Sequence, residues 1–465
     1  MDKDYLYNSI QTNDKYQKKY KKDKYIDPII LKVIEQFISD NKRICYGGTA
    51  INNILPKNKQ FYDYDIDIPD YDFFSPNAID DTKKLCNILS YYNIYHIEAK
   101  SAFFVGTYKI FVNFIPIADI TQINTDFYNS LLKNSILVNQ ILYTNTDFLR
   151  MSLHQELARP LGDISRWEKI YKRLFILNDF YPIILKSNYK NNCKFISGIK
   201  DKHFFNIYNQ LFSIFIDNEV IFCNHNIISN VFYKHLKTKN KKKFYCSNNK
   251  KDLFLCYTND ITQLINTIKL NNIIKESNYI SFQFHESKYK FIGNFVFIHF
   301  KKKIIGIIFE TNSCLSYNSV LYFKKNIKIG NIDMLLNLYF SLLLMDEIPI
   351  SNNILYKQIS ILYNIISNYE SLINTHNGVD NLPNELKRFN LPCIGTQDDY
   401  QNILQQRTRK YKKLKNNKTS SEYKKWFFKY TPIIKKANKK TSKSLFNNKK
   451  SKSIKNKTNK NIKKL

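Results

Sequence analysis

Two adjacent glycines, Gly47 and Gly48, stand between a short apolar run and a run with helical spacing, in a chain with only 10 glycines among its 465 residues. The apolar run Ile44–Tyr46 predicts a strand, and Thr49–Leu55 predicts a helix. Glycine lets the backbone turn sharply between such elements and approach a ligand closely. Thr49 is expected to cap the helix, whose free N–H groups can bind phosphate. A turn that needs glycine for its geometry alone is the alternative.

A pair of aspartates follows further along the chain, Asp70 and Asp72, within the sequence PDYDFFSP. Alternate side chains of a strand share one face, so both carboxylates are expected to project together while Phe73 enters the core. Two carboxylates held so close repel each other unless a cation lies between them. Oxygen ligands of this kind suit Mg²⁺ or Mn²⁺, which predicts a metal site.

Other acids compete for this role. Asp63, Asp65 and Asp67 form a second set with a period of two, and an acidic surface loop is the simplest alternative for either set. We favour Asp70 and Asp72 because the phenylalanines that follow them anchor that segment to a core strand.

A third acid is expected from a neighbouring strand, since two metal ions need more ligands than one D-x-D pair supplies. Asp119 ends the apolar run FVNFIPIAD, where a lone carboxylate is costly unless it coordinates or pairs. Glu98 is the competing choice.

Three motifs and one longer segment together resemble a known family. They are YGGTAIN, PDYDFFSP, IADIT and the segment from Arg150 to Leu174. In this order they resemble the catalytic subunit of poly(A) polymerases from large cytoplasmic DNA viruses, of the giant-virus, asfarvirus and poxvirus type, within the nucleotidyltransferase superfamily. The resemblance covers about residues 43 to 182. Thr49 stands where the wider superfamily usually has serine, and its hydroxyl can make the same hydrogen bonds.

The resemblance implies a template-independent enzyme that adds AMP from ATP to mRNA 3′ ends. Asp70, Asp72 and Asp119 would bind two Mg²⁺ or Mn²⁺ ions, while Gly47, Gly48 and Thr49 would hold the β- and γ-phosphates. The alternatives are another nucleotidyltransferase, which makes oligoadenylate or modifies tRNA ends, and a non-enzymatic nucleic-acid-binding protein.

A group of cations follows the catalytic motifs. Helical spacing predicts that Arg159, Arg166 and Lys169 lie near one another, on a face that contacts triphosphate or RNA. A solvated helix face is the alternative. His154 is expected to be a structural histidine, because metal activation removes the need for a general base.

The order of elements predicts an α+β fold. Strands and helices alternate through the first part of the chain, and antiparallel hairpins are expected beyond Asn191. The resemblance implies a nucleotidyltransferase domain followed by a degenerate domain of similar kind. We expect a polar N-terminal segment over 1–26, the catalytic domain over 27–190, a second mixed domain over 191–405 and a basic, largely disordered tail over 406–465.

The formal net charge of +33 is weak evidence for a polyanionic partner, since only 8 of the 72 basic residues are arginine and an AT-rich coding sequence yields many lysines. The distribution is more informative. From Arg407 to Leu465 the chain has 23 Lys or Arg residues and one acid, Glu422. This density predicts nucleic-acid binding, with a solubilising or nuclear-type basic tail as the alternative.

Compartment and partners follow from composition and the resemblance. No apolar run reaches the roughly 18 residues that span a bilayer, and the polar N-terminus lacks a secretory core. The eight cysteines have no C-x-x-C spacing and are expected to be reduced. We expect the protein in the host cytoplasm, in viral factories, and in the virion. Its expected partners are ATP, RNA 3′ ends, and either a second copy or a viral processivity factor.

Overall fold

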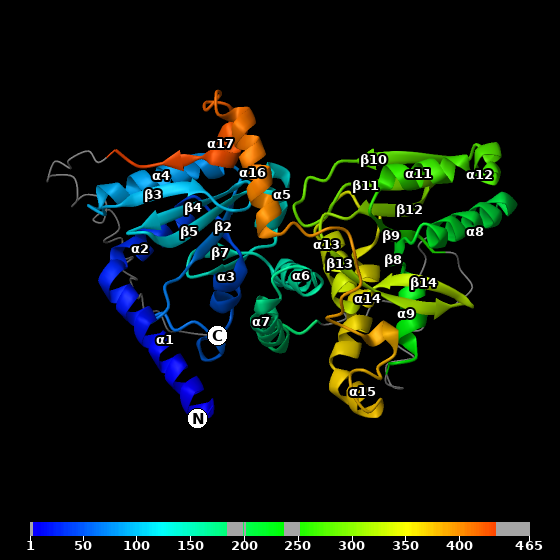
Figure 1. Cartoon of the computed structure of the whole chain (residues 1–465), viewed down its shortest axis with the longest axis horizontal. Coiled ribbons are helices and arrows are strands. Elements are labelled where there is room, and N and C mark those ends of the chain that lie inside the picture. Colours follow the sequence, from blue (N-terminus) through cyan, green and yellow to red (C-terminus); the bar gives the residue numbers. More distant parts are fainter. Residues whose placement is uncertain (1–2, 184–198, 200, 237–251, 434–465) are drawn as a thin grey trace, which may run out of the picture.

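The computed structural model describes residues 3–183, 199, 201–236 and 252–433. It confirms the α+β class. Two sheets of eight strands stand side by side along the long dimension of the molecule, each with helices on it (Figure 1). No helix in these residues is long and apolar enough to cross a membrane.

The first sheet has the strand order β16-β3-β4-β5-β2-β1-β7-β6. The predicted strand at Ile44–Tyr46 is β1, and the two aspartate motifs lie on β2 and β5. The strands are β1 (Ile44–Cys45), β2 (Tyr71–Ser75), β3 (Ile97–Ser101), β4 (Thr107–Val112), β5 (Ile115–Gln122), β6 (Ile136–Val138), β7 (Ile141–Tyr143) and β16 (Lys429–Tyr430).

Amphipathic helices accompany this sheet. Asp27 caps α2 through the Ile29 amide, with proline at the first helical position, and α2 buries Ile30, Val33 and Phe37. The helices are α1 (Lys3–Tyr25), α2 (Pro28–Asp40), α3 (Gly47–Ile54), α4 (Ala78–Tyr91), α5 (Thr125–Lys133), α6 (Thr146–Leu157) and α7 (Trp167–Phe180).

The second sheet has the order β10-β11-β12-β9-β8-β14-β13-β15, and hairpins join several of its strands as predicted. Its strands are β8 (Ile221–Phe222), β9 (Phe254–Thr258), β10 (Ile280–His285), β11 (Phe295–Phe300), β12 (Lys303–Glu310), β13 (Leu315–Tyr322), β14 (Lys325–Gly330) and β15 (Cys393–Ile394). The accompanying helices are α8 (Lys202–Asp217), α9 (His225–Tyr233), α11 (Ile261–Leu270), α12 (Asn272–Ser277), α13 (Ile332–Leu343), α14 (Asn352–Ile366) and α15 (Tyr369–Thr375).

Helix α6 joins the two halves because it is buried on more than one side. Leu149 and Leu153 enter the hydrophobic core of the first sheet, while Phe148 and Met151 enter the core that surrounds the second sheet. The amide of Asn337 on α13 donates to the Met151 carbonyl at 3.1 Å, so the contact between α6 and α13 is also polar.

The expectation of a largely disordered tail from 406 onward is wrong for residues 406–433. The chain forms α16 (Tyr400–Leu414), α17 (Ser421–Phe427) and β16, which pairs antiparallel with β3. The cause is apolar anchoring that charge counting overlooks: Phe428 is buried against Tyr108, and the Arg407 guanidinium donates to the carbonyls of Ala102 and Trp426. Residues 434–465 lie outside the described part.

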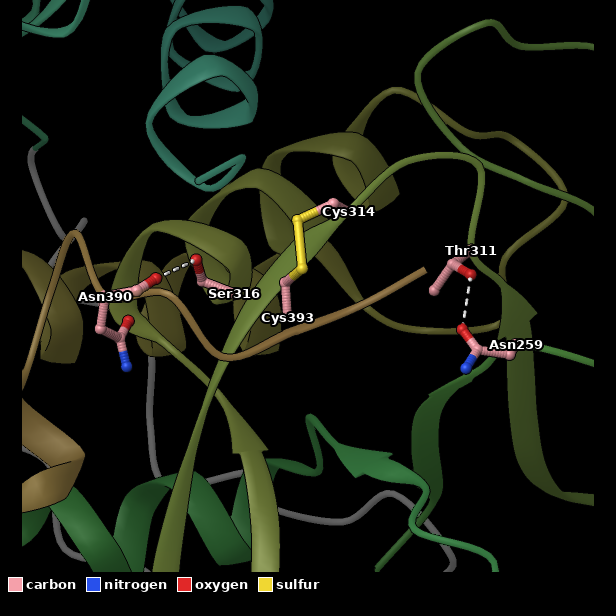
Figure 2. The surroundings of a disulfide bond; sticks show 6 residues. All are labelled: Asn259, Thr311, Cys314, Ser316, Asn390 and Cys393. Carbon is pink, nitrogen blue, oxygen red and sulfur yellow. Dashed lines mark hydrogen bonds between the residues drawn. A yellow bond between two sulfur atoms is a disulfide. The ribbon is translucent and has the colours of Figure 1, made fainter. Parts of the chain in front are cut away.

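The expectation of reduced thiols is wrong for one pair. Cys314 and Cys393 are joined in a disulfide (Figure 2). Antiparallel pairing of β13 with β15 sets Ser316 opposite Cys393 and brings the two cysteine Cα atoms within 5.5 Å. The partners are 79 residues apart in the chain, so their spacing gave no sign of pairing. Four other cysteines are free and buried, and Cys193 and Cys246 lie outside the described residues.

Candidate active site

Two of the predicted carboxylates lie on neighbouring strands. β2 and β5 are parallel, and their register places Asp72 directly opposite Asp119. Asp70 lies two residues before Asp72, at the start of β2, and is exposed. The competing acid Glu98 is on β3, where it pairs with Lys100, and β4 separates that strand from β5. The sheet thus brings Asp119, rather than Glu98, to the aspartate pair.

Burial and mutual repulsion disfavour the ionised forms of Asp72 and Asp119. Burial raises the pKa of Asp72 well above its usual range, and the charges of Asp70 and Asp119 raise it further. Burial, followed by the charge of Asp70, raises the pKa of Asp119 to about 6. Lys109 opposes both shifts. The site therefore lacks enough positive charge of its own for three ionised carboxylates.

Lys109 satisfies only one side of Asp119. It lies opposite Asp119 on β4, and its Nζ is 3.0 Å from Asp119 Oδ2. The other oxygen, Oδ1, is buried and has no hydrogen-bond partner among the described residues. An orphaned carboxylate oxygen beside two further carboxylates is the donor chemistry that divalent cations prefer.

Within the described ranges, no group of three or more His, Cys, Asp or Glu side chains is already arranged to hold a metal ion. Mg²⁺ does not require such a cage, because it keeps several waters and binds through one or two carboxylates together with substrate phosphates. The open pair of Asp72 and Asp119, with Asp70 beside it, fits this mode of binding.

The glycine turn is built against the carboxylates. Gly47 begins α3 with a φ of +73°, and a Cβ placed on it would lie 2.8 Å from Asp72 Oδ2. A Cβ on Gly48 would lie 2.6 Å from the Tyr62 hydroxyl and 2.7 Å from Arg173 Nη1. Gly47 is therefore required by its backbone conformation and by the close approach of Asp72, whereas a side chain at Gly48 would have to displace the flexible ends of Tyr62 and Arg173.

Thr49 does not cap the helix as predicted. α3 begins two residues earlier, its N-cap residue is Tyr46, and no side chain caps it. Thr49 is buried, and its hydroxyl donates to the Asp70 carbonyl at 2.8 Å. This bond fixes the start of β2 to the turn, so Thr49 positions Asp70 through the backbone.

The three predicted cations do not share one helical face, because the helix breaks after Leu157. Arg159 lies beyond the end of α6, where it is ion-paired with Glu156. Arg166 lies in the short 3₁₀ turn Ile164–Arg166, and its charge lowers the pKa of Asp72. Lys169 is on α7. The structure thus places Arg166 near Asp72, sets Lys169 beside Arg166, Arg173 and Asp67, and pairs Arg159 with Glu156 instead.

A fourth cation, Arg173, was missed. Its guanidinium donates to the Tyr62 hydroxyl at 2.6 Å and lies over the Phe61 ring, directly against Gly48. Burial and the charges of Arg173 and Arg166 lower the pKa of Lys169, so these cations crowd one another. Arg173 follows Arg166 by seven residues, a helical spacing that could have identified it.

The alternative acidic set, Asp63, Asp65 and Asp67, forms hydrogen bonds within its own turn. The Asp65 amide donates to Asp63 Oδ1, and the Asp63 amide donates to Asp67 Oδ2. These carboxylates close their own turn between α3 and β2, so the predicted period-two pattern does not form a strand there.

His154 is structural, as expected. It is fully buried, with Nδ1 at 2.9 Å from Asp333 Oδ1 and Nε2 at 2.7 Å from the Tyr363 hydroxyl. Arg150 is also buried and donates to Asn178. Neither side chain reaches the carboxylates through a bond of its own.

The fold and these residues together define a nucleotidyltransferase-like catalytic domain. Comparison with known proteins is more specific: residues 32–163 match the family model described as "Poly(A) polymerase catalytic subunit".

Curated relatives cover the same region. A candidate poly(A) polymerase catalytic subunit of Acanthamoeba polyphaga mimivirus is 35% identical over 159 residues, which is 33% of this chain and 26% of the relative. One from African swine fever virus (isolate Pig/Kenya/KEN-50/1950) is 27% identical over 171 residues, 35% of each chain. The matched segment thus spans only about a quarter to a third of the curated relatives' length.

The fold likeness extends much further. The crystal structure of the Megavirus polyadenylate synthase matches with a TM-score of 0.74, covering 93% of this chain and 86% of that chain at 21% sequence identity. Both sheets therefore share their architecture with a known structure.

Proposed function

We propose that this chain is a template-independent poly(A) polymerase that adds AMP from ATP to mRNA 3′ ends. The observation that carries the proposal is the pairing of Asp72 with Asp119 on parallel strands, beside a glycine turn that touches Asp72. The match of residues 32–163 to a poly(A) polymerase family model supports polyadenylation rather than another nucleotidyl transfer.

Asp70, Asp72 and Asp119 would hold two Mg²⁺ or Mn²⁺ ions. Bound there, the ions supply positive charge to the attacking and leaving oxygens of the in-line displacement. In that reaction a bond forms between the primer 3′ oxygen and the α-phosphorus, the bond to pyrophosphate breaks, and the hydroxyl proton is released.

The chain's own cations and amides orient the triphosphate. The N-terminus of α3, with the backbone of Gly47, Gly48 and Thr49, offers N–H groups to the β- and γ-phosphates. Arg173 lies over this turn and Arg166 faces Asp72, with Lys169 beside them. They neutralise the leaving pyrophosphate, and Arg159, paired with Glu156, takes no part.

The remaining assignments follow from the same reaction. The substrates are ATP and the 3′ end of mRNA, and the partner is a second copy or a viral processivity factor. Relatives in large DNA viruses support action in the host cytoplasm, and we include packaging in the virion in the proposal.

A primer-extension experiment tests the function. The full chain is incubated with a labelled oligoribonucleotide and each of the four nucleotides, with and without divalent metal, and with tRNA as the competing acceptor. We expect extension of the primer with ATP only, and only with metal. Preference for tRNA, or extension without metal, would contradict the proposal.

A matched pair of variants tests the site. Asp72→Asn removes a carboxylate from the centre and is expected to lower kcat about 1000-fold, since phosphoryl transfer depends mainly on charge stabilisation. Glu98→Gln makes the same change at the competing acid and should leave kcat unchanged. Equal losses in the two variants would refute the assignment.

A further inference from the structure

A cavity of about 520 Å³ lies between the two halves of the molecule. It is lined by the ends of the first sheet, by α5 and α6, by the loop between β10 and β11, and by α17. Its volume suits a nucleotide-sized ligand. It is separate from the glycine turn, and none of the sequence motifs predicted it.

The cavity begins one step along β2 from the contact between Asp72 and the glycine turn. Along β2, the carbonyl of Asp70 accepts from Thr49, the carboxylate of Asp72 touches Gly47, and the ring of Phe74 stacks on Tyr46. Phe74 and Tyr46 line the cavity. Two residues of strand span about 7 Å, so the cavity begins one such step beyond Asp72.

The lining is suited to an unpaired base. Tyr46 and Phe74 form a stacked pair with centroids 4.0 Å apart, and Phe127, Phe148 and Phe291 add further aromatic surface. The Tyr46 hydroxyl bonds Thr121 at 2.8 Å, which connects the wall of the cavity to the strand of Asp119. Aromatic side chains bind bases of single-stranded nucleic acid by stacking.

Three lysines line this cavity: Lys288, which is ion-paired with Glu347, and Lys290 and Lys425, which come from distant segments. Lys290 comes from the loop between β10 and β11, and Lys425 comes from α17. Lys290 Nζ donates to the Val105 carbonyl at 3.2 Å, and burial together with the charge of Lys425 lowers the pKa of Lys290 to about 8. Neither Lys290 nor Lys425 has an ion-pair partner within the described residues, and no acid lines the cavity.

We propose that this cavity holds the 3′-terminal nucleotide of the RNA primer, with its base against the aromatic wall and a backbone phosphate on Lys290 and Lys425. The phosphates of ATP are all attached to one side of its sugar, and in this proposal they bind to the glycine turn and Arg173. A second anion site beyond the carboxylates has no group of ATP to bind, whereas every linkage of an RNA strand has a phosphate. The inference rests on the proposed polymerase function and names the primer subsite of that centre.

The test is a double variant, K290Q/K425Q, assayed on the full chain with an oligo(A) primer. We expect the KM for primer to rise about tenfold or more, with kcat and the KM for ATP unchanged. The slope of log affinity against log salt should fall by about 0.7, since the two lysines share one phosphate and each single-strand phosphate contact contributes about 0.7. The control K302Q/K324Q removes two exposed lysines from hairpin turns outside the cavity and should leave all these values unchanged.

A second variant tests the cavity itself. Ser152→Phe places a ring into the space from α6 and is expected to raise the KM for primer without lowering the melting temperature. A rise in the KM for ATP in either variant would assign the cavity to the incoming nucleotide and overturn the proposal. Equal behaviour of K290Q/K425Q and its control would overturn it as well. Absence of any primer extension by the wild-type chain would instead refute the polymerase function.

Discussion

The two sheets have the same plan, but only the first carries the acids. From β3 to β6 the first sheet runs β3-β4-β5-β2-β1-β7-β6, and the second runs β10-β11-β12-β9-β8-β14-β13. The directions also agree, since β2 is parallel to β5 as β9 is to β12, and β1 is antiparallel to β2 as β8 is to β9. The second half thus repeats the strand order and directions of the first.

Register identifies the residues that stand in place of the acids. Cys45 pairs with Phe73 in the first sheet, and Phe222 pairs with Cys256 in the second. Phe73 and Cys256 therefore occupy equivalent positions, and so do the residues that precede them, Asp72 and Leu255. The residue that pairs with Leu255 is Ile307, so it stands at the position of Asp119. Both replacements are buried and apolar, which removes any metal site there.

The helix that follows the first strand differs too. At the N-terminus of α3, Arg173 lies against Gly48. At the N-terminus of α9, a carboxylate of the protein itself accepts a hydrogen bond from a backbone amide of the helix. Asp252 accepts from the amides of Asn226 and Leu253 at 2.8 and 2.9 Å. In the proposed function the turn of α3 binds phosphate, whereas the second half occupies the equivalent position with its own Asp252. A fold can therefore keep its topology while its chemistry is lost.

The largest expected effect comes from placing an acid in the second sheet. Leu255→Asp puts a carboxylate into a site that is 4% exposed, beside Ile307, which lies opposite Phe297 where Asp119 lies opposite Lys109. We expect a loss of about 4 kcal/mol or more in unfolding free energy, measured by urea denaturation, and no new activity. Leu321→Asp, on a strand of the same sheet but 77% exposed, is the control. Similar stability for both variants would show that the second sheet retains a polar site.

A second prediction concerns the buried carboxylate of Asp333 in the second half, which His154 of α6 also contacts. Arg388 makes two bonds of 2.8 Å to the Asp333 carboxylate on α13, and both side chains are fully buried. Arg388→Met leaves that carboxylate without its cation and is expected to cost about 3–5 kcal/mol of unfolding free energy. The exposed Arg409→Met should cost nothing measurable. A small loss at Arg388 would mean that the Asp333 carboxylate is stabilised in the fold without its cation.

A third prediction addresses the open helix turn. Arg173→Gln removes the guanidinium over Gly48, and a charge-assisted bond to phosphate contributes about 1.5–3 kcal/mol. The KM for ATP should therefore rise about 10- to 100-fold, with the KM for primer unchanged. Lys172→Gln, which removes an exposed lysine paired with Glu168, is the control. An unchanged KM for ATP would show that the turn binds triphosphate without Arg173.

The sequence predicted those parts of the site that depend on local pattern. The spacing of Asp70 and Asp72 follows from strand periodicity, and Asp119 follows from the cost of a carboxylate at the end of an apolar run. Arg173 could have been found from its helical spacing to Arg166. The second, degenerate domain was expected only from the resemblance, because Leu255 and Ile307 look like ordinary core residues.

Other features depend on tertiary contacts that no local pattern records. Lys290 and Lys425 meet only because α17 returns to the first sheet, and that return depends on Phe428 packing against Tyr108. The disulfide between Cys314 and Cys393 depends on the pairing of β13 with β15. Such contacts join segments separated by long stretches of chain, so periodicity and composition cannot predict them.

The smallest expected effect is a pH dependence at the contact between the halves. His154 on α6 faces Asp333, Arg388, Arg150 and Tyr363. Burial lowers its pKa, and the charges of Arg388 and Arg150 lower it further, against the opposing influence of Asp333. The imidazole is therefore neutral in the fold, whereas in the unfolded chain it binds a proton below about pH 6.5.

Because the unfolded state binds the additional proton, stability falls as the pH decreases from 7 to 5. His154 contributes a slope of up to about 1.4 kcal/mol per pH unit. Buried His225, whose pKa burial lowers to about 3, acts in the same direction. His154→Gln should reduce the slope of unfolding free energy against pH by its share, while the exposed His203→Gln leaves it unchanged. If both variants keep the wild-type slope, His154 is charged in the fold. Asp333 would then be paired with two cations, Arg388 and His154, rather than with Arg388 alone beside a neutral imidazole.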